Sequence, residues 1–160
     1  MQPARIGGVV SIDGLPVFPG TEDVPPEQRP QVAEGMRARM AAVTGPAFAA
    51  QQKQYMRSIG VVDMDKGDEL AKLSARSDPA AMAAYAAGIV ALDLRPQLSA
   101  ITAPVLVMAP YFALDAMQAG VTAPQKLAYY RELMQGTPRL EVFAIEDRKS
   151  TRLNSSHITI

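Results

Sequence analysis

The chain has 160 residues, of which 48% are hydrophobic and 20% are charged, and its 16 basic and 16 acidic side chains cancel. This length and composition fit one globular domain, and the balanced charge argues against nucleic acid and anionic membranes as partners. Because the chain has no cysteine, a disulfide framework, a thiolate nucleophile and a cysteine zinc site are excluded.

The first predicted element is a strand over Ile6 to Ile12, a nearly continuous apolar run rich in β-branched residues. Such a run is typical of a strand covered on both faces, as in a parallel sheet. It begins only a few residues after Met1 with no targeting signal before it, and first residues usually fray, so we expect an artificial start to the chain. The strand ends at Asp13 and Gly14, and a passage rich in Pro and Gly follows.

From Gln31 to Leu94 the apolar residues follow a helical period. Two amphipathic helices lie on either side of Gly45-Pro46, a shorter one covers Asp68 to Arg76, and a fourth begins at Asp78, which is an N-cap residue followed by a proline. The apolar stripes of the two long helices and the fourth are Val32, Met36, Met40 and Val43; Phe48, Tyr55, Met56 and Ile59; and Met82, Tyr85, Ile89 and Leu92. Most of the nine methionines are interpreted as core filler. The apolar run of the fourth helix is too short to span a bilayer, so no membrane span is expected.

After Leu94 the pattern returns to that of a sheet. A buried strand is predicted over Ala103 to Ala109, ending at Pro110, and a second over Arg139 to Ile145. Between them, Thr122 to Gln135 is predicted as a helix with a threonine cap and an early proline. Strand, helix and strand with short connections form the right-handed βαβ unit of a parallel sheet. The sequence therefore predicts an α/β fold.

Three segments on this frame, RIGGVVSIDGLPVFPG, DLRPQLSAITAPVLVMAP and RLEVFAIED, with a helical insert after the first, together resemble the C-terminal half of an α/β-hydrolase. The resemblance covers nearly all of the chain before Asp147. It implies a partial α/β-hydrolase parallel sheet of about three strands, the family's sixth, seventh and eighth, with a helical cap insertion. Residues 1–20 and 95–146 would form the hydrolase core, and residues 21–94 the cap.

The last segment, residues 147–160 (DRKSTRLNSSHITI), resembles the translation of a sequencing-library adapter over its whole length. We therefore expect a non-native, disordered tail and exclude it from the reasoning about sites. It contains the only histidine, His157, which lies in a polar stretch with no apolar neighbours to build a dry pocket. His157 is rejected as a catalytic base.

The family implies a catalytic serine in a G-x-S-x-G turn, an acid after strand six or seven and a histidine after strand eight. This chain contains no G-x-S-x-G, and the adapter-like tail begins where the histidine is expected. Of the three groups, the acid remains. Asp13, at the C-terminal edge of its strand, would accept a hydrogen bond from the imidazole and fix its tautomer; alternatively, its side chain caps the turn before Gly14. Asp115, after the later strand, is the second candidate for the acid.

One acidic group is similar in spacing to a calcium loop, namely Asp63, Asp65 and Asp68. The residue at the twelfth position of such a loop is Ala75 rather than the bidentate glutamate that calcium requires. The glycines form no phosphate-binding motif. We expect neither a metal nor a cofactor, and interpret the acidic group as a solvated helix-entry loop.

Two functions remain. The first is a C-terminal fragment of a serine hydrolase, with esterase-like Ser-His-Asp chemistry on a small apolar or ester substrate, and inactive alone because the serine turn and histidine are absent. The alternative is a non-enzymatic, helix-rich binding or interaction module. A sheet without the family's first five strands would leave an unpaired edge at Ile6 to Ile12 or its neighbour, which predicts poor solubility or aggregation.

Overall fold

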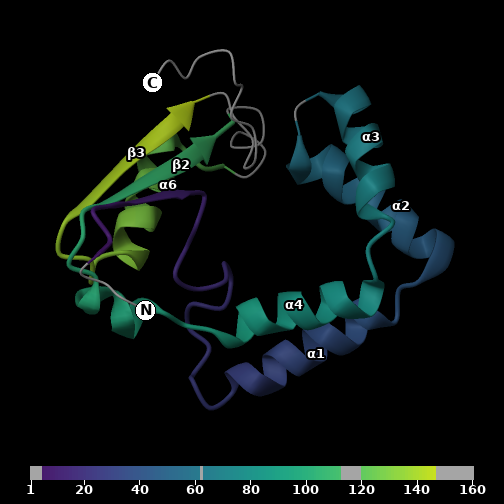
Figure 1. The fold of residues 1–160 in the computed structure, drawn as a ribbon, viewed down its shortest axis with the longest axis horizontal. Coiled ribbons are helices and arrows are strands. Elements are labelled where there is room, and N and C mark those ends of the chain that lie inside the picture. Colours follow the sequence, from purple (N-terminus) through teal and green to yellow (C-terminus); the bar gives the residue numbers. More distant parts are fainter. Residues whose placement is uncertain (1–4, 62, 113–119, 147–160) are drawn as a thin grey trace.

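The computed structural model describes residues 5–61, 63–112 and 120–146. In chain order the elements are β1 (Val9–Ile12), α1 (Arg29–Ala41), α2 (Gly45–Tyr55), the π-helix η2 (Met56–Gly60), α3 (Met64–Ser74), α4 (Pro79–Ala91), the 3-10 helix η3 (Arg95–Ala100), β2 (Val105–Tyr111), α6 (Ala123–Leu133) and β3 (Leu140–Glu146). Figure 1 shows two parts, a core formed by the strands and α6, and an arm formed by α1 to α4. The arm is inserted between β1 and β2.

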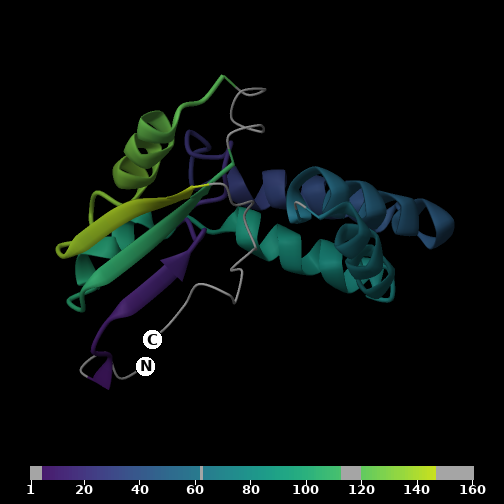
Figure 2. The ribbon, with the colours of Figure 1, turned by 90° about the horizontal axis from the view of Figure 1, so that it is seen from above.

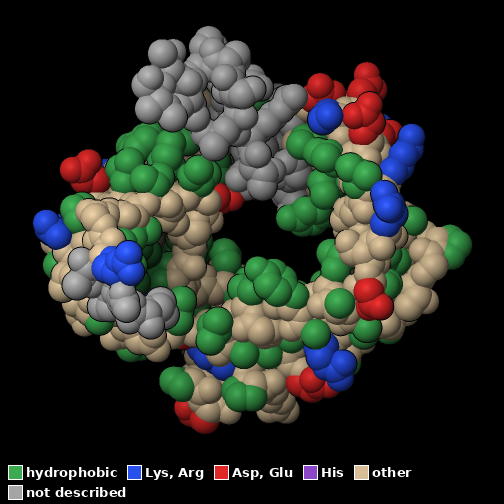
Figure 3. Space-filling model, in the orientation of Figure 1, with side chains coloured by type: hydrophobic (Ala, Val, Ile, Leu, Met, Phe, Trp, Pro, Cys, Tyr) green, Lys and Arg blue, Asp and Glu red, His purple; other side chains and the backbone are tan. Residues whose placement is uncertain are grey.

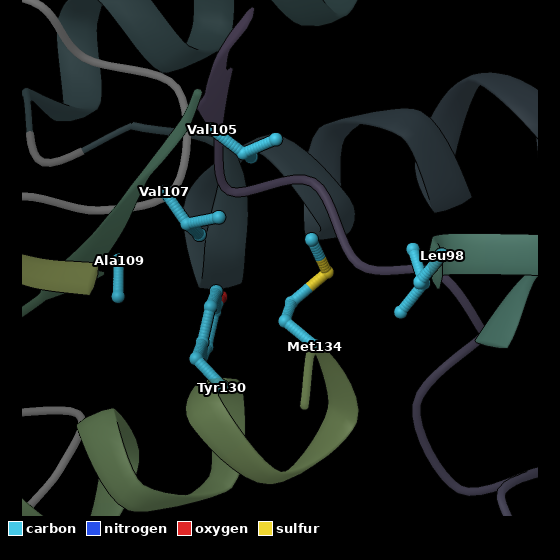
Figure 4. Packing of buried hydrophobic residues seen from close by; sticks show 6 residues of the cluster. All are labelled: Leu98, Val105, Val107, Ala109, Tyr130 and Met134. Atoms are coloured by element: carbon cyan, nitrogen blue, oxygen red, sulfur yellow. The ribbon is translucent and has the colours of Figure 1, made fainter. Parts of the chain in front are cut away.

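The core is a parallel three-stranded sheet in the order β1-β2-β3. The buried residues Val105, Val107 and Ala109 point from β2 toward Tyr130 and Met134 of α6 and its C-terminal end (Figure 4). Each fully buried valine or methionine side chain contributes about 1.5–3 kcal/mol. The predicted α/β class and the strand, helix, strand unit are confirmed.

The strand β2 extends through Pro110, where the sequence predicted its end. The backbone N–H of Asp13 donates to the Met108 carbonyl, and β1 pairs with β2 no further than Met108. A backbone N–H at position 110 would point toward β1, the side to which the Met108 carbonyl points. Because no paired β1 residue lies opposite, the missing N–H of proline removes no hydrogen bond between these strands.

The strand β1 does not fit its prediction as a strand covered on both faces. It is shorter than predicted, beginning at Val9, and the side chains of Val10 and Ile12 are 62% and 46% exposed. The register places these two side chains on the face opposite α6, in line with Leu106 and Met108 of β2. The prediction was wrong because β1 lies at the edge of the described sheet, and α6 covers the other face.

The arm consists of two helix pairs, α1 with α4 and α2 with α3 (Figures 1 and 2). Small side chains form the contact between α1 and α4, where Ala33, Ala87 and Val90 are buried together. Ala83, also on α4, is fully buried. Such residues let two helix backbones approach closely. Within the described ranges, no helix combines the length and apolar character needed to cross a membrane.

The apolar stripe predicted on α4 is not the face on which this helix packs. Tyr85 is 75% exposed, and Ile89 and Leu92 are also exposed. On α1 the predicted stripe packs only in part: Met36 packs against the cluster of Ala33, Ala87 and Val90, whereas Val32 is exposed. Both faces of the alanine-rich helix α4 are apolar. The face that packs against α1 is therefore the one whose small residues allow close packing, and not the one that carries the larger side chains.

The helix starts agree with the capping signals. Asp78 accepts a hydrogen bond from the Ala81 N–H at 2.9 Å, as predicted. Thr122 forms a capping box with Gln125, which confirms the predicted threonine cap. The predicted third helix begins earlier than expected, at Met64, because Asp63 caps it by accepting from the Lys66 N–H at 3.1 Å.

Candidate functional site

Asp13 lies directly after β1, at the carboxyl edge of the sheet, where open α/β folds place their sites. Its backbone adopts a φ of 58°, the left-handed region that non-glycine residues enter at a cost of about 1–2 kcal/mol. Its N–H donates to the Met108 carbonyl at 3.0 Å. The strand therefore turns sharply at Asp13 while remaining bonded to β2.

The side chain of Asp13 meets a tyrosine from α6. The Tyr130 hydroxyl donates to Oδ1 of Asp13 at 2.5 Å. Tyr130 is only 3% exposed, and burial, followed by the bond to Asp13, raises its pKa well above the ordinary value for tyrosine. The hydroxyl therefore remains a proton donor at neutral pH and fixes the orientation of the carboxylate.

The turn after Asp13 is bonded separately, since Ser11 Oγ donates to the Gly14 carbonyl at 3.4 Å. The partner found for the Asp13 side chain is thus Tyr130, rather than a backbone N–H of the turn. From the sequence, Tyr130 was assigned no role beyond its place in the predicted helix Thr122 to Gln135. Its hydroxyl gave no local signal, because its partner is 117 residues away.

A cavity of about 330 Å³ adjoins this pair, between the core and the base of the arm. It is lined by Asp13, Leu15, Pro16, Val17, Phe18, Pro19, Ile89, Leu92, Leu94 and Tyr130. Its walls are apolar apart from the carboxylate and the phenol. This arrangement suits a small apolar molecule with a polar group near Asp13.

Beyond this cavity, the molecule is hollowed between the core and the arm (Figure 3). Hydrophobic side chains gather along the rim that α4 forms on this hollow. The exposed Tyr85 and Ile89 belong to α4, and Ile89 also lines the cavity. The face of α4 turned away from α1 is therefore an apolar surface that continues to Asp13.

Two connections that run antiparallel join the arm to the core. Val17 and Asp93 form an isolated antiparallel bridge, and the Leu94 N–H donates to the Pro16 carbonyl at 2.8 Å. The geometry of these connections sets the shape of the cavity, because most of the residues that line it lie on them: Leu15, Pro16, Val17, Phe18, Pro19, Leu92 and Leu94.

Arg29, at the start of α1, is buried and forms hydrogen bonds to both of these connections. It is 3% exposed and donates to the Thr21 carbonyl at 2.7 Å and to the Leu92 carbonyl at 3.3 Å. It also pairs with Asp93 at 3.3 Å, and Arg95 pairs with the same carboxylate at 2.7 Å. Hydrogen bonds from Arg95 hold the pKa of Asp93 below its usual range. This cluster was not predicted from the sequence, where its one available signal was an arginine at the start of a predicted amphipathic helix.

The remaining predicted site residues are not part of this constellation. Asp115 and His157 lie outside the described residues. In the acidic group once compared with a calcium loop, Asp63 caps α3, while Asp68 pairs with Lys53 at 3.1 Å and Arg57 at 3.3 Å. The described part of the chain holds no group of three or more His, Cys, Asp or Glu side chains placed to bind a metal ion.

No protein-family model matches the sequence, and no curated protein matches it. Solved structures do match. MenH from S. aureus superposes with a TM-score of 0.57 at 15% identity, over 91% of this chain and 52% of that one. A thermophilic esterase from Thermogutta terrifontis, with malate bound, superposes with a TM-score of 0.52 at 17% identity, over 91% of this chain and 49% of that one.

The chain therefore spans about half the length of these solved structures. Both have the α/β-hydrolase fold, and likeness at such low identity concerns the fold alone. The predicted fold class is confirmed: the chain forms part of an α/β-hydrolase parallel sheet, three strands wide, with a helical insertion after the first of them.

Proposed function

We propose that this chain is the C-terminal half of a serine hydrolase that cleaves ester or related acyl bonds. The observation that carries the proposal is Asp13, held by Tyr130 at the carboxyl edge of the sheet and facing an apolar cavity under the arm. A thermophilic esterase is among the solved structures that share this fold. In this proposal residues 21–94 are the cap of the enzyme, and residues 1–20 and 95–146 belong to its core.

In the proposed mechanism the serine and histidine come from outside the described residues. The serine attacks the carbonyl carbon of the ester, and the histidine takes its proton and gives it to the alcohol that departs as the ester bond breaks. Water, deprotonated by the same histidine, then releases the acid from the acyl-serine and restores the serine hydroxyl. Asp13 accepts a hydrogen bond from the imidazole Nδ1–H, which selects the tautomer that leaves Nε2 free to act as the base. A carboxylate can accept several hydrogen bonds, so the bond from Tyr130 is compatible with this role. The cavity beside Asp13 holds the small apolar part of the substrate.

We propose that the chain of 160 residues is inactive by itself. It contains no G-x-S-x-G, and its one histidine lies in the segment that resembles an adapter. The purified chain should hydrolyse p-nitrophenyl acetate no faster than buffer. Turnover above that background, lost in Asp13→Asn, would refute this part of the proposal.

The decisive experiment is to read the source DNA on both sides of the segment that encodes residues 1–146. We expect a G-x-S-x-G between a strand and a helix upstream, and a histidine codon in place of the adapter-like tail downstream. In the enzyme encoded by that frame, Asp13→Asn should lower kcat by about 10⁴-fold with little change in KM. Asp115→Asn is the matched variant. If only Asp115→Asn lowers kcat, the catalytic acid is Asp115 instead of Asp13.

A second candidate function is a non-enzymatic interaction module, which the exposed Tyr85 and Ile89 on α4 favour. An in-frame stop codon close upstream of Met1, without any G-x-S-x-G, would favour this module over the hydrolase.

A further inference from the structure

The connection from β1 to the arm is bonded at two points to neighbouring residues of α6. The Tyr130 hydroxyl donates to Oδ1 of Asp13 at 2.5 Å, and the Tyr129 hydroxyl donates to Oε1 of Glu22. Residues 13–22, which we name the wall segment, therefore lie between two anchors that one helix supplies. The bonded partners are 117 and 107 residues apart in the chain, so the packing of α6 brings them together.

The two tyrosines of α6 are held in different orientations. Their rings meet edge to face, with centroids 6.1 Å apart and planes 79° apart, an arrangement that aromatic pairs favour. Tyr130 is buried, whereas Tyr129 is half-buried. Adjacent residues of a helix point in directions about 100° apart. One turn of α6 can therefore reach both ends of the wall segment.

The Glu22 end of the wall segment is bonded through a charged group. The hydrogen bond from Tyr129 holds the pKa of Glu22 below its usual range, so this side chain is a carboxylate at neutral pH. Hydrogen bonds to a carboxylate are about twice as strong as those between neutral groups. Arg95 also donates to the Glu22 carbonyl at 2.6 Å, and Arg29 donates to the Thr21 carbonyl at 2.7 Å. Tyr129 adds the bond that joins this end to α6.

The wall segment forms much of the cavity beside Asp13, and it runs from β1 to α1 (Figure 1). Most of the residues that line the cavity belong to it, namely Asp13, Leu15, Pro16, Val17, Phe18 and Pro19. Because proline has a fixed φ, Pro16 and Pro19 stiffen the backbone between the two anchors. The position of a stiff segment depends on the points at which it is held. A shift at the Glu22 end should therefore change the width of the cavity.

We propose that Tyr129 is a positioning residue for this cavity: through Glu22 it holds the wall segment at the width that the structure shows. Tyr130 does the same at the other end, where Asp13 lies. Without the Tyr129 bond, the wall segment gains freedom at its Glu22 end and the cavity admits larger groups. The hold on the wall segment does not depend on the proposed hydrolase function. Its consequence for a substrate, a limit on the size of the group beside Asp13, rests on that function.

The surroundings of Tyr129 allow its hydroxyl to be removed without harm to the core. Tyr129 and Glu22 also line a second cavity, of about 690 Å³, next to η3. The Glu22 carboxylate therefore stays accessible to water when its partner is removed, which avoids the cost of a buried unpaired charge. Tyr129→Phe also keeps the ring beside Tyr130. We expect this variant to fold.

Spin labels can measure where the wall segment lies, because the chain has no cysteine and two introduced ones can be labelled specifically. Asp23→Cys, beside Glu22, and Glu141→Cys, on β3, are at exposed positions. Pulsed electron paramagnetic resonance gives the distribution of distances between the two labels. Tyr129→Phe should broaden this distribution, because the loss of one hydrogen bond raises the population of displaced states about threefold or more.

Two controls separate this effect from a general loosening of the fold. A second label pair, at the exposed Ala128 of α6 and at Glu141, should keep its distance distribution in Tyr129→Phe, since both positions lie outside the wall segment. Tyr111→Phe is the matched variant. It removes a hydroxyl that donates to the Val121 carbonyl, outside the wall segment, and should leave both distributions unchanged.

Changes at Glu22 test whether the bond itself is responsible. Glu22→Gln keeps an oxygen that can accept from Tyr129, and should broaden the distribution less than Glu22→Ala. Combining Tyr129→Phe with Glu22→Ala should add nothing to Glu22→Ala alone, because both changes remove the same bond. An unchanged distribution in Tyr129→Phe would overturn the proposal, as would equal broadening for the Ala128 and Glu141 pair.

The size limit is tested in the enzyme that the source DNA encodes. Tyr129→Phe should reduce the preference for p-nitrophenyl acetate over p-nitrophenyl octanoate, as a ratio of kcat/KM, about threefold or more. The change should lie mainly in a lower KM for the octanoate, whereas Asp13→Asn lowers kcat. A source frame without the serine and histidine would refute the proposed function and leave the label distances as evidence for the hold on the wall segment. Ester hydrolysis with an unchanged preference would overturn the size limit alone.

Discussion

The Tyr130 hydroxyl and the Asp13 carboxylate, 117 residues apart in the chain, form a hydrogen bond of 2.5 Å. This bond joins α6 to the carboxyl end of β1, at a residue whose backbone is held in the left-handed region. The donor is buried and remains protonated, so the acceptor is oriented before any substrate arrives. The proposed catalytic acid is thus positioned by the packing of the core.

Replacing Tyr130 by Phe should lower the free energy of unfolding by about 1–3 kcal/mol, because Asp13 loses a hydrogen bond to a charged acceptor while the ring still fills the core. Urea denaturation at one fixed protein concentration measures the loss. Tyr85→Phe removes the hydroxyl of a tyrosine that is 75% exposed, and should change the same quantity by less than about 0.5 kcal/mol. Equal effects of the two changes would show that the buried bond adds no stability.

The chain should lose stability at alkaline pH. Burial, together with the bonds to Glu22 and Asp13, raises the pKa values of Tyr129 and Tyr130 above that of an unfolded tyrosine, about 10. Above this pH the unfolded chain releases protons that the folded chain retains. The stabilising contribution is therefore complete below pH 10 and is lost as the pH rises beyond it.

Absorbance at 295 nm, recorded with far-UV circular dichroism, checks this alkaline loss. Ionisation of Tyr129 and Tyr130 should coincide with unfolding, and Tyr130→Phe should reduce the pH dependence. Ionisation of all five tyrosines in a chain that keeps its helical signal would contradict the prediction.

Arg29→Lys should destabilise the chain by about 2 kcal/mol. A single ammonium group cannot reach the Thr21 carbonyl, the Leu92 carbonyl and Asp93 together, so buried acceptors lose their donor. Arg37→Lys is the control, since Arg37 pairs with Glu34 on the exposed surface of α1, and its cost should be below about 0.5 kcal/mol. Chemical denaturation compares the two, and a cost for Arg29→Lys no larger than that for Arg37→Lys would contradict the role of this cluster.

Ala83→Leu should destabilise the arm, because Ala83 is fully buried on α4, the helix that packs against α1. Overpacking of this kind costs about 1–3 kcal/mol. Ala84→Leu introduces the same residue at the neighbouring exposed position, and should leave the Tm nearly unchanged. The opposite order of the two Tm values would mean that α4 packs with its other face.

Features encoded by neighbouring residues could be predicted from the sequence. The caps at Asp78 and Thr122, and the strands β2 and β3, were predicted to within two residues. These signals depend on residues three or four positions apart. The extension of β2 through Pro110 could not be predicted in this way, because it depends on where β1 stops pairing.

The packing faces were less predictable than the elements themselves. The helical period of α4 is satisfied equally by its alanines and by Tyr85 and Ile89, so local pattern could not choose between the two faces. The exposure of β1 could not be predicted either, because the same run of branched apolar residues occurs in strands that a neighbouring element covers and in strands that it does not.

By itself, the sequence determined the α/β order of elements and the place of Asp13 at the end of a strand, because both depend on short-range periodicity and turn residues. Only the tertiary structure decided what surrounds that carboxylate. It brought Tyr130 to Asp13, and it brought Arg29 to the Leu92 carbonyl and Asp93, 63 and 64 residues away. Bonds between such distant side chains leave no periodic trace in the sequence, because they form only where the packing of helices and sheet places the partners within reach.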